Sequence, residues 1–291
     1  MTRTRGFHTM NHTNSTRATR DWLGRAISHL ILIAGSVLMA TPFVWMISTS
    51  LKRQSEVFAY PPRWIPDPIH WSNYSKALEA FPFWRYTLNT VYISVFITLG
   101  VMLTSSMAGY AFARMRFSGR DHLFLLILAV MMVPGQVTMI PVFLIVKSLG
   151  WMDSHLALII PSLASPFGIF LLRQFYLTLP RDLEDAAYID GCGPFRVYWQ
   201  IFVPLSKPAL ATLGIFTFMG AWNSFLWPLI LISSDRKKVL TVGLLTFQNM
   251  FTTRYNLLMA AALLATLPIL IAYIFAQRYF IEGIALTGIK G

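Results

Sequence analysis

Six long apolar segments, none of them interrupted by an acid or a lysine, constrain this chain more than any other feature. A helix needs about 20 predominantly apolar residues to cross the hydrocarbon core of a bilayer. Each segment reaches that length, and the one charge inside them is Arg173, near the end of the fourth. Helices that are apolar on every side belong in lipid or inside a bundle. The sequence therefore predicts an all-α integral membrane helical bundle with six transmembrane helices. The segments are Ile27–Ser50, Tyr86–Ala113, His122–Val146, His155–Leu177, Pro208–Ser233 and Tyr255–Gln277.

These segments divide the chain into three parts. Residues 1–26 form a polar N-terminal extension, residues 27–280 the transmembrane domain and residues 281–291 a C-terminal tail. The extension carries five arginines against one acid, Asp21, and basic residues beside a span favour the cytoplasm. Because the number of predicted spans is even, we expect both termini to be cytoplasmic. The first apolar segment is longer than the core of a cleavable signal peptide, so we expect an uncleaved anchor.

The net charge of +12 raises the question of a nucleic-acid partner. The sequence contains no nucleic-acid recognition motif and no compact basic domain. Basic residues that flank membrane spans meet anionic lipid headgroups. We therefore expect these charges to contact membrane lipid and no nucleic acid.

The residues give no sign of catalysis. The chain has no G-x-x-x-x-G-K-[ST] phosphate loop, its six histidines are scattered, and its single Cys192 excludes a multi-cysteine metal site. We expect no catalytic residue, cofactor-binding residue or metal ligand, and hence no enzyme. Ion-coupled transporters usually place an ionisable residue at membrane depth, and the centres of the apolar segments hold none. A secondary transporter or channel acting alone stays open as the alternative, with a membrane enzyme or assembly factor as a third possibility.

Prolines fall inside several segments and predict kinks or breaks, because each removes a backbone hydrogen bond. The external loop of residues 51–85 is rich in proline and aromatic residues. It either anchors at the headgroup level or binds an external partner. The prolines within the segments are Pro134 (followed by Gly135) and Pro141 in the third, Pro161 and Pro166 in the fourth, Pro228 in the fifth and Pro268 in the sixth.

One internal loop gathers the negative charge in the stretch DLEDAAYIDG. Four of the twelve acids stand between Asp182 and Asp190. Asp182 followed by Asp185 resembles a helix cap, and acids in a first turn suit the helix dipole. Gly191 is placed to end such a helix in a left-handed conformation. By i, i+3, i+4, i+7 spacing, one face of this helix would consist of Leu183, Ala186, Ala187 and Asp190.

A second short helix is predicted from Pro194, with Phe195, Tyr198 and Phe202 on one side and Pro204 at its end. Ser206-Lys207-Pro208 then opens the next span. Residues 180–207 are therefore predicted to form a helix–turn–helix in the cytoplasm. Its alanine pair permits close approach by another protein, whose basic groups would meet the acids. Alternatively, the hairpin lies on the membrane surface with its acids toward water. The residues alone leave both readings open.

The loop resembles the EAA motif of the permease subunits of bacterial ATP-binding-cassette importers, E-A-A-x-x-x-G, nine residues, then I-x-L-P. The departures are Asp185 before the alanine pair and Val203 in place of leucine. The chain as a whole is similar to the smaller permease subunit of the maltose-type, binding-protein-dependent carbohydrate importers. Further stretches carry the resemblance: AGYAFARMRFSGRD (Ala108–Asp121), FGIFLLRQFYLTLPRDLEDAAYIDG (Phe167–Gly191), WNSFLWPL (Trp222–Leu229) and EGIALTGIKG (Glu282–Gly291).

The resemblance implies that loop 180–207 is a coupling helix between spans four and five, seated on a cytoplasmic ATPase subunit. It implies the bacterial inner membrane and import of a sugar or sugar-like solute. The implied partners are a second permease subunit in a heterodimer, two ATPase subunits, which bind the ATP, and an extracytoplasmic solute-binding protein. The residues given the coupling role are Glu184, Asp185, Ala186, Ala187, Asp190, Gly191, Ile201 and Pro204. The tail residues given an ATPase contact are Gly288, Lys290 and Gly291.

Overall fold

The structure, a computed structural model, describes residues 13–248 and 252–288. Within these residues the chain is helical apart from its loops and an isolated antiparallel bridge between Gln248 and Thr253, which confirms the all-α prediction. The elements are α1 (Thr13–Ser50), η1 (Gln54–Glu56), α2 (Ser72–Glu79), α3 (Phe83–Arg114), α4 (Arg120–Met131), α5 (Met139–Ser148), α6 (Leu156–Ser162), α7 (Pro166–Thr178), α8 (Asp182–Ile189), α9 (Pro194–Val197), η2 (Tyr198–Phe202), α10 (Val203–Leu205), α11 (Lys207–Trp222), α12 (Leu226–Leu231), α13 (Leu240–Gly243), η3 (Leu244–Phe247) and α14 (Tyr255–Gly288).

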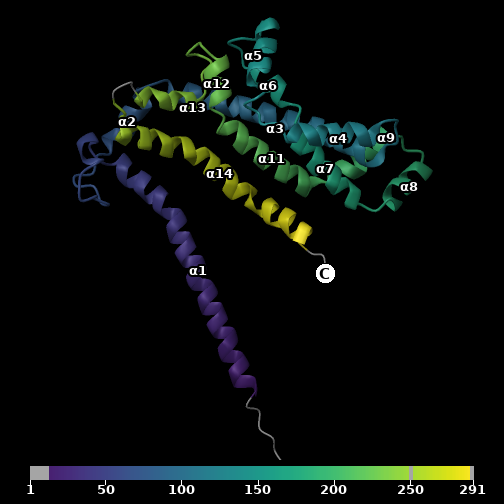
Figure 1. Ribbon diagram of the computed structural model, residues 1–291, viewed down its shortest axis with the longest axis horizontal. Helices are drawn as coiled ribbons and strands as arrows, with labels where there is room; N and C mark the ends of the chain where they lie inside the picture. The colour runs from purple at the N-terminus through teal and green to yellow at the C-terminus, as the bar shows by residue number, and fades with distance from the viewer. Residues whose placement is uncertain (1–12, 249–251, 289–291) are drawn as a thin grey trace, which may run out of the picture.

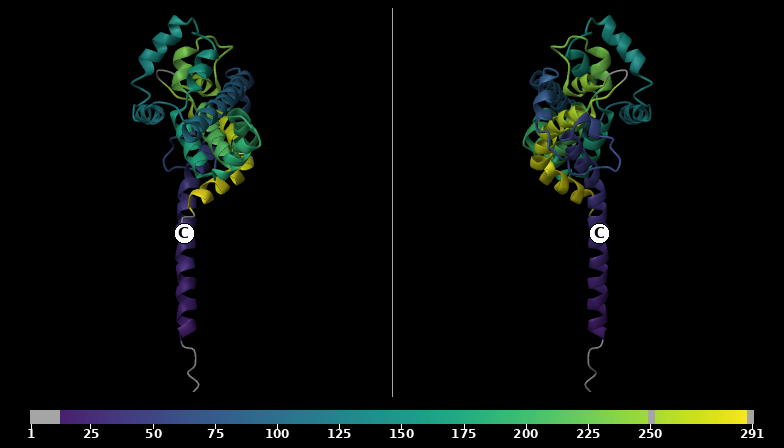
Figure 2. Two further views of the ribbon diagram at one scale, coloured as in Figure 1. Left: turned by 90° about the vertical axis from the view of Figure 1, so that its right-hand side faces the viewer. Right: turned by 90° about the vertical axis from the view of Figure 1, so that its left-hand side faces the viewer.

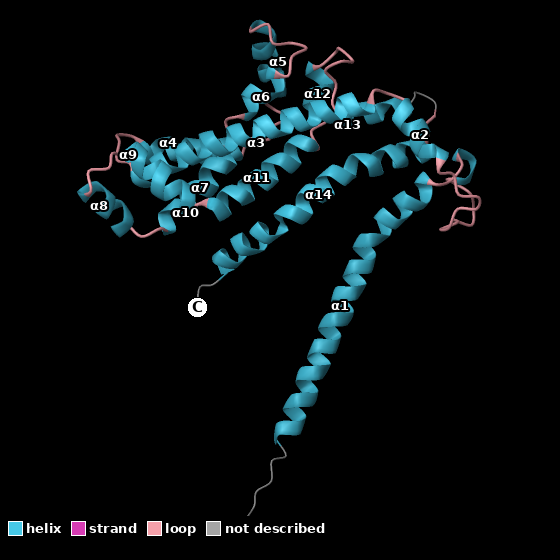
Figure 3. Cartoon of the chain, turned by 180° about the vertical axis from the view of Figure 1, so that it is seen from behind, coloured by secondary structure: helices cyan, strands magenta, loops and turns pink. Residues whose placement is uncertain are grey.

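The bundle is built around α3. Helices α7 and α11 pack against α3, α14 packs against α11, and α4 packs against α7. Figures 1 and 3 show these helices running roughly along the same direction. Leu172 and Leu213 are fully buried in the core between them. At Gly109 of α3 an added Cβ would lie 3.0 Å from the backbone nitrogen of Arg173, so glycine there lets α3 and α7 approach closely.

The two ends of the bundle carry different elements. Helices α8 and α9 lie at one end, and α2 lies toward the other (Figure 1). The C-terminal end of α1 contacts the bundle, and the rest of the helix projects away from the bundle, as the side views show (Figure 2). Within residues 24–50 of α1 the apolar side chains are mostly exposed, for example Leu38 at 70% and Met39 at 73%, and only Ser48–Ser50 are buried.

Among the described residues, four helices are long and apolar enough to cross a membrane. They are Gly24–Ser50, Phe83–Arg114, Leu156–Thr178 and Tyr255–Ile274. A fifth candidate is the pair Pro194–Leu205 and Lys207–Trp222, whose two parts meet at 76°. The coarser prediction of several apolar membrane helices is thus confirmed, whereas the count of six stays a prediction.

The prolines act differently from one segment to the next. The third predicted segment is not one continuous helix, because α4 ends at Met131 and α5 begins at Met139, with Pro134 and Gly135 between them. Pro166 occupies the first turn of α7, where its missing N–H removes no helical hydrogen bond. Pro268 lies inside α14 without ending it.

Candidate functional site

The acidic loop forms the helix α8 that the sequence predicts, but without the predicted cap. Its N-cap residue is Arg181, and no side chain caps the first turn. Asp182 is the first helical residue, so it lies one position too late to act as the cap. The three acids of the first turn, Asp182, Glu184 and Asp185, still lie where the positive end of the helix dipole stabilises negative charge.

The buried face of α8 is not the face on which the spacing groups Leu183, Ala186, Ala187 and Asp190. Glu184 and Ala187 are buried, at 8% and 6% exposure, whereas Leu183 is 41% exposed. Ala186 and Asp190 are exposed as well. Tertiary contacts bury the acid Glu184, because it has a cationic partner inside the bundle.

The end of α8 follows the prediction. Gly191 has a φ of 77°, in the left-handed region that glycine enters without strain. Its amide donates to the carbonyl of Tyr188 at 3.0 Å, and the amide of Cys192 donates to the carbonyl of Ala187 at 2.9 Å. These two bonds are a Schellman motif. A Cβ at Gly191 would meet nothing within 4 Å, so this turn faces open space.

The second part of the loop is more continuous than predicted. Helix α9 runs directly into the π-helical turn η2 and then α10, so Pro204 lies within the helical run instead of ending it. Of the three aromatic residues predicted to share one side of this helix, Tyr198 and Phe202 are buried, whereas Phe195 is 66% exposed. Ile201 is half-buried and Pro204 is exposed. Helix α11 then begins at Lys207, with Ser206 as its N-cap residue and a proline in the first turn, as expected.

Arg114, the last residue of α3, fastens α8 to the bundle. Its Nη1 lies 3.6 Å from Oε2 of Glu184, and only 4% and 11% of the two side chains are exposed. Nη2 donates to the carbonyl oxygens of Tyr176, at 2.6 Å, and Leu179. The guanidinium also lies 5.0 Å from the ring centroid of Phe202. One side chain therefore contacts α8, the C-terminal end of α7 and η2.

Sequence reasoning missed Arg114. The second predicted apolar segment ends at Ala113, and Arg114, which follows it, is not among the predicted site residues. Its position was the available signal, because an arginine that directly follows a long apolar segment stands at the end of a predicted span.

An aromatic cluster, made of Tyr110, Tyr176, Tyr198 and Phe202, supports the same junction. The ring of Phe202 lies 4.9 Å from that of Tyr110 and 5.5 Å from that of Tyr176, centroid to centroid. The hydroxyl groups of Tyr198 and Ser106 are 2.6 Å apart. Aromatic pairs at these separations stabilise beyond their buried area, so η2 is held firmly against α3 and α7.

The surface left on α8 and α9 combines acids with apolar groups. Asp182, Asp185 and Asp190 are exposed. Ile189 is 86% exposed and lies on the same helix. Exposed large apolar residues rimmed by charge are typical of a protein contact surface. Of the predicted tail residues, Gly288 is the last residue of α14, and Lys290 and Gly291 lie outside the described residues.

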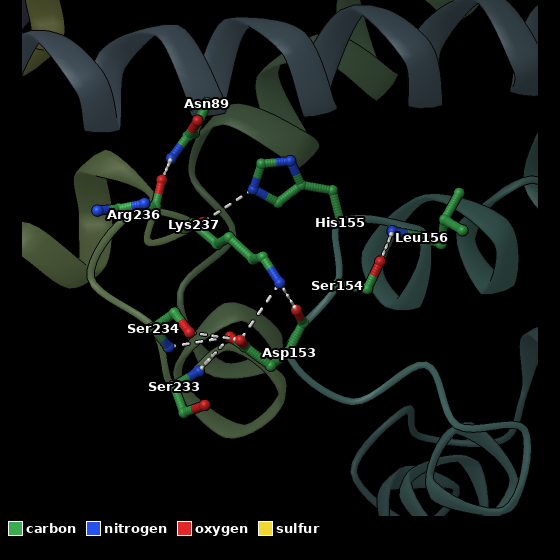
Figure 4. Close-up of polar contacts among 9 residues, drawn as sticks. All are labelled: Asn89, Asp153, Ser154, His155, Leu156, Ser233, Ser234, Arg236 and Lys237. Carbon is green, nitrogen blue, oxygen red and sulfur yellow. Dashed lines mark hydrogen bonds and ion pairs between the residues drawn. The ribbon is translucent and has the colours of Figure 1, made fainter.

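A second polar cluster joins the α5–α6 loop to the α12–α13 loop (Figure 4). Asp153 accepts hydrogen bonds from the amides of Ser233, at 3.0 Å, and Ser234, at 2.9 Å, and from the Ser234 hydroxyl. Lys237 donates to its carboxylate at 3.3 Å and to its backbone carbonyl. Bonds from the Ser234 hydroxyl and amide, joined by those from Ser233 and Lys237, hold the pKa of Asp153 well below its usual value.

The same loop is tied to α3. Asn89 donates to the carbonyl oxygens of Arg236, at 3.0 Å, and Lys238, at 2.8 Å (Figure 4 draws the first of these bonds). The hydroxyl of Thr90 accepts from the amide of Leu240 at 2.9 Å. The N-terminal part of α3 therefore holds the α12–α13 loop, just as its C-terminal residue holds α8.

A cavity of about 400 Å³ lies between α3, α5, α6, α11 and α12. Much of its lining is apolar, but hydroxyl-bearing residues contribute from several helices, and Trp227 contributes an indole. Such a lining can accept and donate hydrogen bonds and offer an aromatic face. The hydroxyl-bearing residues are Thr90, Thr138, Ser162, Thr217 and Ser224.

Comparison with known proteins places these features in a family. The chain is 39% identical to an arabinooligosaccharide transport system permease protein of Halalkalibacterium halodurans, over 73% of this chain and 76% of the relative. It is 35% identical to its counterpart in Bacillus subtilis, over 88% and 92%. It is also 35% identical to an sn-glycerol-3-phosphate transport system permease protein of Yersinia pestis, over 88% and 94%.

A solved structure has the same fold. A chain of a bacterial ABC transporter involved in the import of the acidic polysaccharide alginate superposes with a TM-score of 0.78 at 24% identity, over 94% of this chain and 100% of that one. Residues 97–285 match the family described as binding-protein-dependent transport system inner membrane component. The chain therefore belongs to this family of transport permeases, as the resemblance of its internal loop implies.

Proposed function

We propose that this chain is one of two permease subunits of a bacterial ATP-binding-cassette importer and that residues 180–207 couple it to a separate ATPase subunit. The observation that carries the proposal is the construction of α8. Its inner face is fastened to α3 and α7 through the Arg114–Glu184 pair, while its outer face presents exposed acids and Ile189. A partner that displaces α8 would therefore also displace α3 and α7, to which α8 is attached.

The proposal gives separate roles to the residues of the loop. Glu184 and Ala187 seat α8 on the bundle, and Ala186, Asp185 and Asp190 meet the ATPase. Gly191 turns the chain back without a side chain at the contact. Ile201 and Pro204 lie in the helical segment that connects α8 to α11. The tail after Gly288, with Lys290 and Gly291, reaches toward the same partner. ATP is bound by the ATPase, and this chain supplies no cofactor site.

The exposed surface of α1 supports the proposal of a second permease subunit. A helix whose apolar surface is exposed along most of its length packs little against its own bundle. We propose that the second permease covers part of this surface and that the two subunits enclose the pathway between them. The six spans would be α1, α3, α4 with α5, α6 with α7, α11 with α12, and α14. With α8 inside, both termini are cytoplasmic.

The cargo class rests on the relatives and on the cavity. The relatives named above transport arabinooligosaccharides and sn-glycerol-3-phosphate, so we propose a sugar or sugar-like solute. Hydroxyls and an indole around the 400 Å³ cavity suit that chemistry, since sugars bind through hydrogen bonds and aromatic stacking. An extracytoplasmic binding protein would deliver the solute to the end opposite α8.

Purification of the tagged full chain from its native membranes tests the coupling. The expected result is co-purification of an ATPase subunit that is lost in Asp185→Lys and retained in Glu79→Lys. Glu79 is a matched control because it is exposed, carries the same charge and lies at the end of α2. Equal retention in both variants contradicts α8 as the contact. Solute uptake into liposomes by the chain alone would instead establish the secondary transporter or channel.

A further inference from the structure

A basic cavity of about 430 Å³ opens between the α3–α4 loop and the residue that precedes α8. Arg116 and Arg120 line it from one side and Arg181 from the other, although they are more than 60 positions apart in the sequence. The rest of the wall is formed by Phe117, Gly119, Asp121 and His122. The motif around Arg116 is part of the family resemblance, but the coupling function does not use it.

The residues that the structure describes do not balance the positive charges of this cavity. Asp121 pairs with Arg120, with an Nε–Oδ1 distance of 2.9 Å, and hydrogen bonding from Arg120 lowers the pKa of Asp121. Among the described residues, Arg116 and Arg181 have no hydrogen-bond or ion-pair partner for their side chains. Two arginines that line the same cavity therefore have no carboxylate partner among the described residues.

Helix α4 adds to this potential. It begins at Arg120 and runs for 12 residues from the wall of the cavity. The first amides of a helix have no partner within it, and its dipole favours an anion at that end. Guanidinium groups bind phosphate through paired hydrogen bonds. The ligand chemistry that fits the cavity is therefore a phosphate group.

The surroundings distinguish a lipid phosphate from a free one. Phe117 lies in the wall at 40% exposure, and the outward residues of α4 that follow are apolar, with Leu125 at 61% and Leu126 at 63% exposure. An acyl chain can lie along this surface while its headgroup occupies the cavity. The position beside Arg181 puts the cavity at the same end as α8, where anionic lipids of the cytoplasmic leaflet attract basic groups.

We infer that Arg116, Arg120 and Arg181 form a binding site for the phosphate headgroup of an anionic phospholipid, with its acyl chains along α4. The assignment of this lipid to the cytoplasmic leaflet rests on the membrane orientation given under the proposed function. The binding of the lipid to these arginines does not depend on that orientation. The site would fix the α3–α4 loop and the start of α8 against the membrane surface.

The test is a titration of the purified full chain with phosphatidylglycerol, followed by native mass spectrometry, with phosphatidylcholine as the neutral lipid. Each arginine near a lipid surface contributes about 1 kcal/mol. The double variant Arg116→Gln/Arg181→Gln should therefore bind phosphatidylglycerol at least about tenfold more weakly. The control is Arg63→Gln/Arg85→Gln, which removes two exposed arginines near the opposite end. Equal melting temperatures in phosphatidylcholine check the folding of both variants.

Each other outcome overturns the inference. Unchanged affinity in the double variant means that these arginines do not bind the lipid. Equal loss in the control pair means diffuse electrostatic attraction. Equal thermal stabilisation by inorganic phosphate means a site for a soluble anion. If the isolated chain binds phosphatidylglycerol and the complex with its ATPase does not, the arginines belong to the protein interface.

Discussion

Replacing Arg114 by methionine tests the junction between α3 and the loop of residues 180–207, for which we propose the coupling role. Methionine keeps the unbranched apolar stem of the side chain, so packing beside Phe202 is largely retained. The substitution removes the ion pair with Glu184 and the two hydrogen bonds to the carbonyls of Tyr176 and Leu179. It leaves Glu184 buried without a cation.

The size of the effect follows from distance and burial. At 3.6 Å the attraction between unit charges is roughly 4 to 5 kcal/mol at an effective dielectric constant of about 20, and most of it is offset by the cost of removing the charges from water. Breaking a buried pair from one side costs about 3–5 kcal/mol. The equilibrium for opening of α8 should therefore rise by roughly a hundredfold to a few thousandfold.

Amide hydrogen exchange of the full chain in lipid nanodiscs measures this opening. Exchange in residues 182–192 should accelerate by up to that factor in Arg114→Met. It should recover at least about tenfold in Arg114→Met/Glu184→Gln, which leaves no unpaired charge. The matched control is Arg196→Met, because Arg196 is exposed and its side chain bonds only to Gln200. Exchange within about threefold of the unmodified chain, or no recovery in the double variant, would refute the role of this pair.

Three further substitutions test other parts of the structure. Gly191→Ala places a side chain on a residue in the left-handed conformation, at a cost of about 1–2 kcal/mol, and should speed hydrogen exchange of the Cys192 amide. Gly191→Asn should cost less, because asparagine tolerates this conformation better. Equal effects of the two substitutions would contradict backbone strain as the cause. The lowered pKa of Asp153 means that its stabilising effect is complete above the ordinary value of 3.8 and is lost as the pH falls toward the lowered one. Asp153→Asn should therefore lower the melting temperature by a constant amount between pH 8 and pH 5, and the two melting temperatures should become equal in stronger acid. A gap between them that grows on acidification would contradict the stabilising role of the Asp153 carboxylate. Gly109→Leu should prevent the close approach of α3 and α7 and lower the yield of folded protein, whereas Gly35→Leu, on the exposed part of α1 with nothing within 4 Å of an added Cβ, should not.

Features set by neighbouring residues could be predicted from the sequence. The left-handed end of α8 depends on Gly191 alone, and the break between α4 and α5 follows from Pro134 and Gly135, which lower helix stability wherever they stand. The start of α11 at Lys207 follows equally from the residues around it.

Features set by distant contacts could not be predicted. The sequence predicts that the acids of this loop meet a partner protein or water, because nothing near Glu184 in the sequence shows that Arg114 lies within reach. One local feature also differs from the sequence prediction, which ends the second short helix at Pro204, whereas α10 continues to Leu205. In the structure the amide of Val203 bonds to the carbonyl of Tyr198, five residues back, and this wider turn accommodates the missing N–H of the proline. The coupling role itself depended on the family motif, since the residues alone left two readings of the loop.

Helix α3 connects two attachments that were described separately. Near one end Asn89 and Thr90 hold the α12–α13 loop, and at the other Arg114 holds α8. About 25 residues separate them, or nearly 40 Å at 1.5 Å per residue. Prolines lie inside α1 and α14, but α3 contains none. A helix uninterrupted by proline therefore joins α8 to the α12–α13 loop, and a displacement of α8 along the axis of α3 would be passed on to that loop.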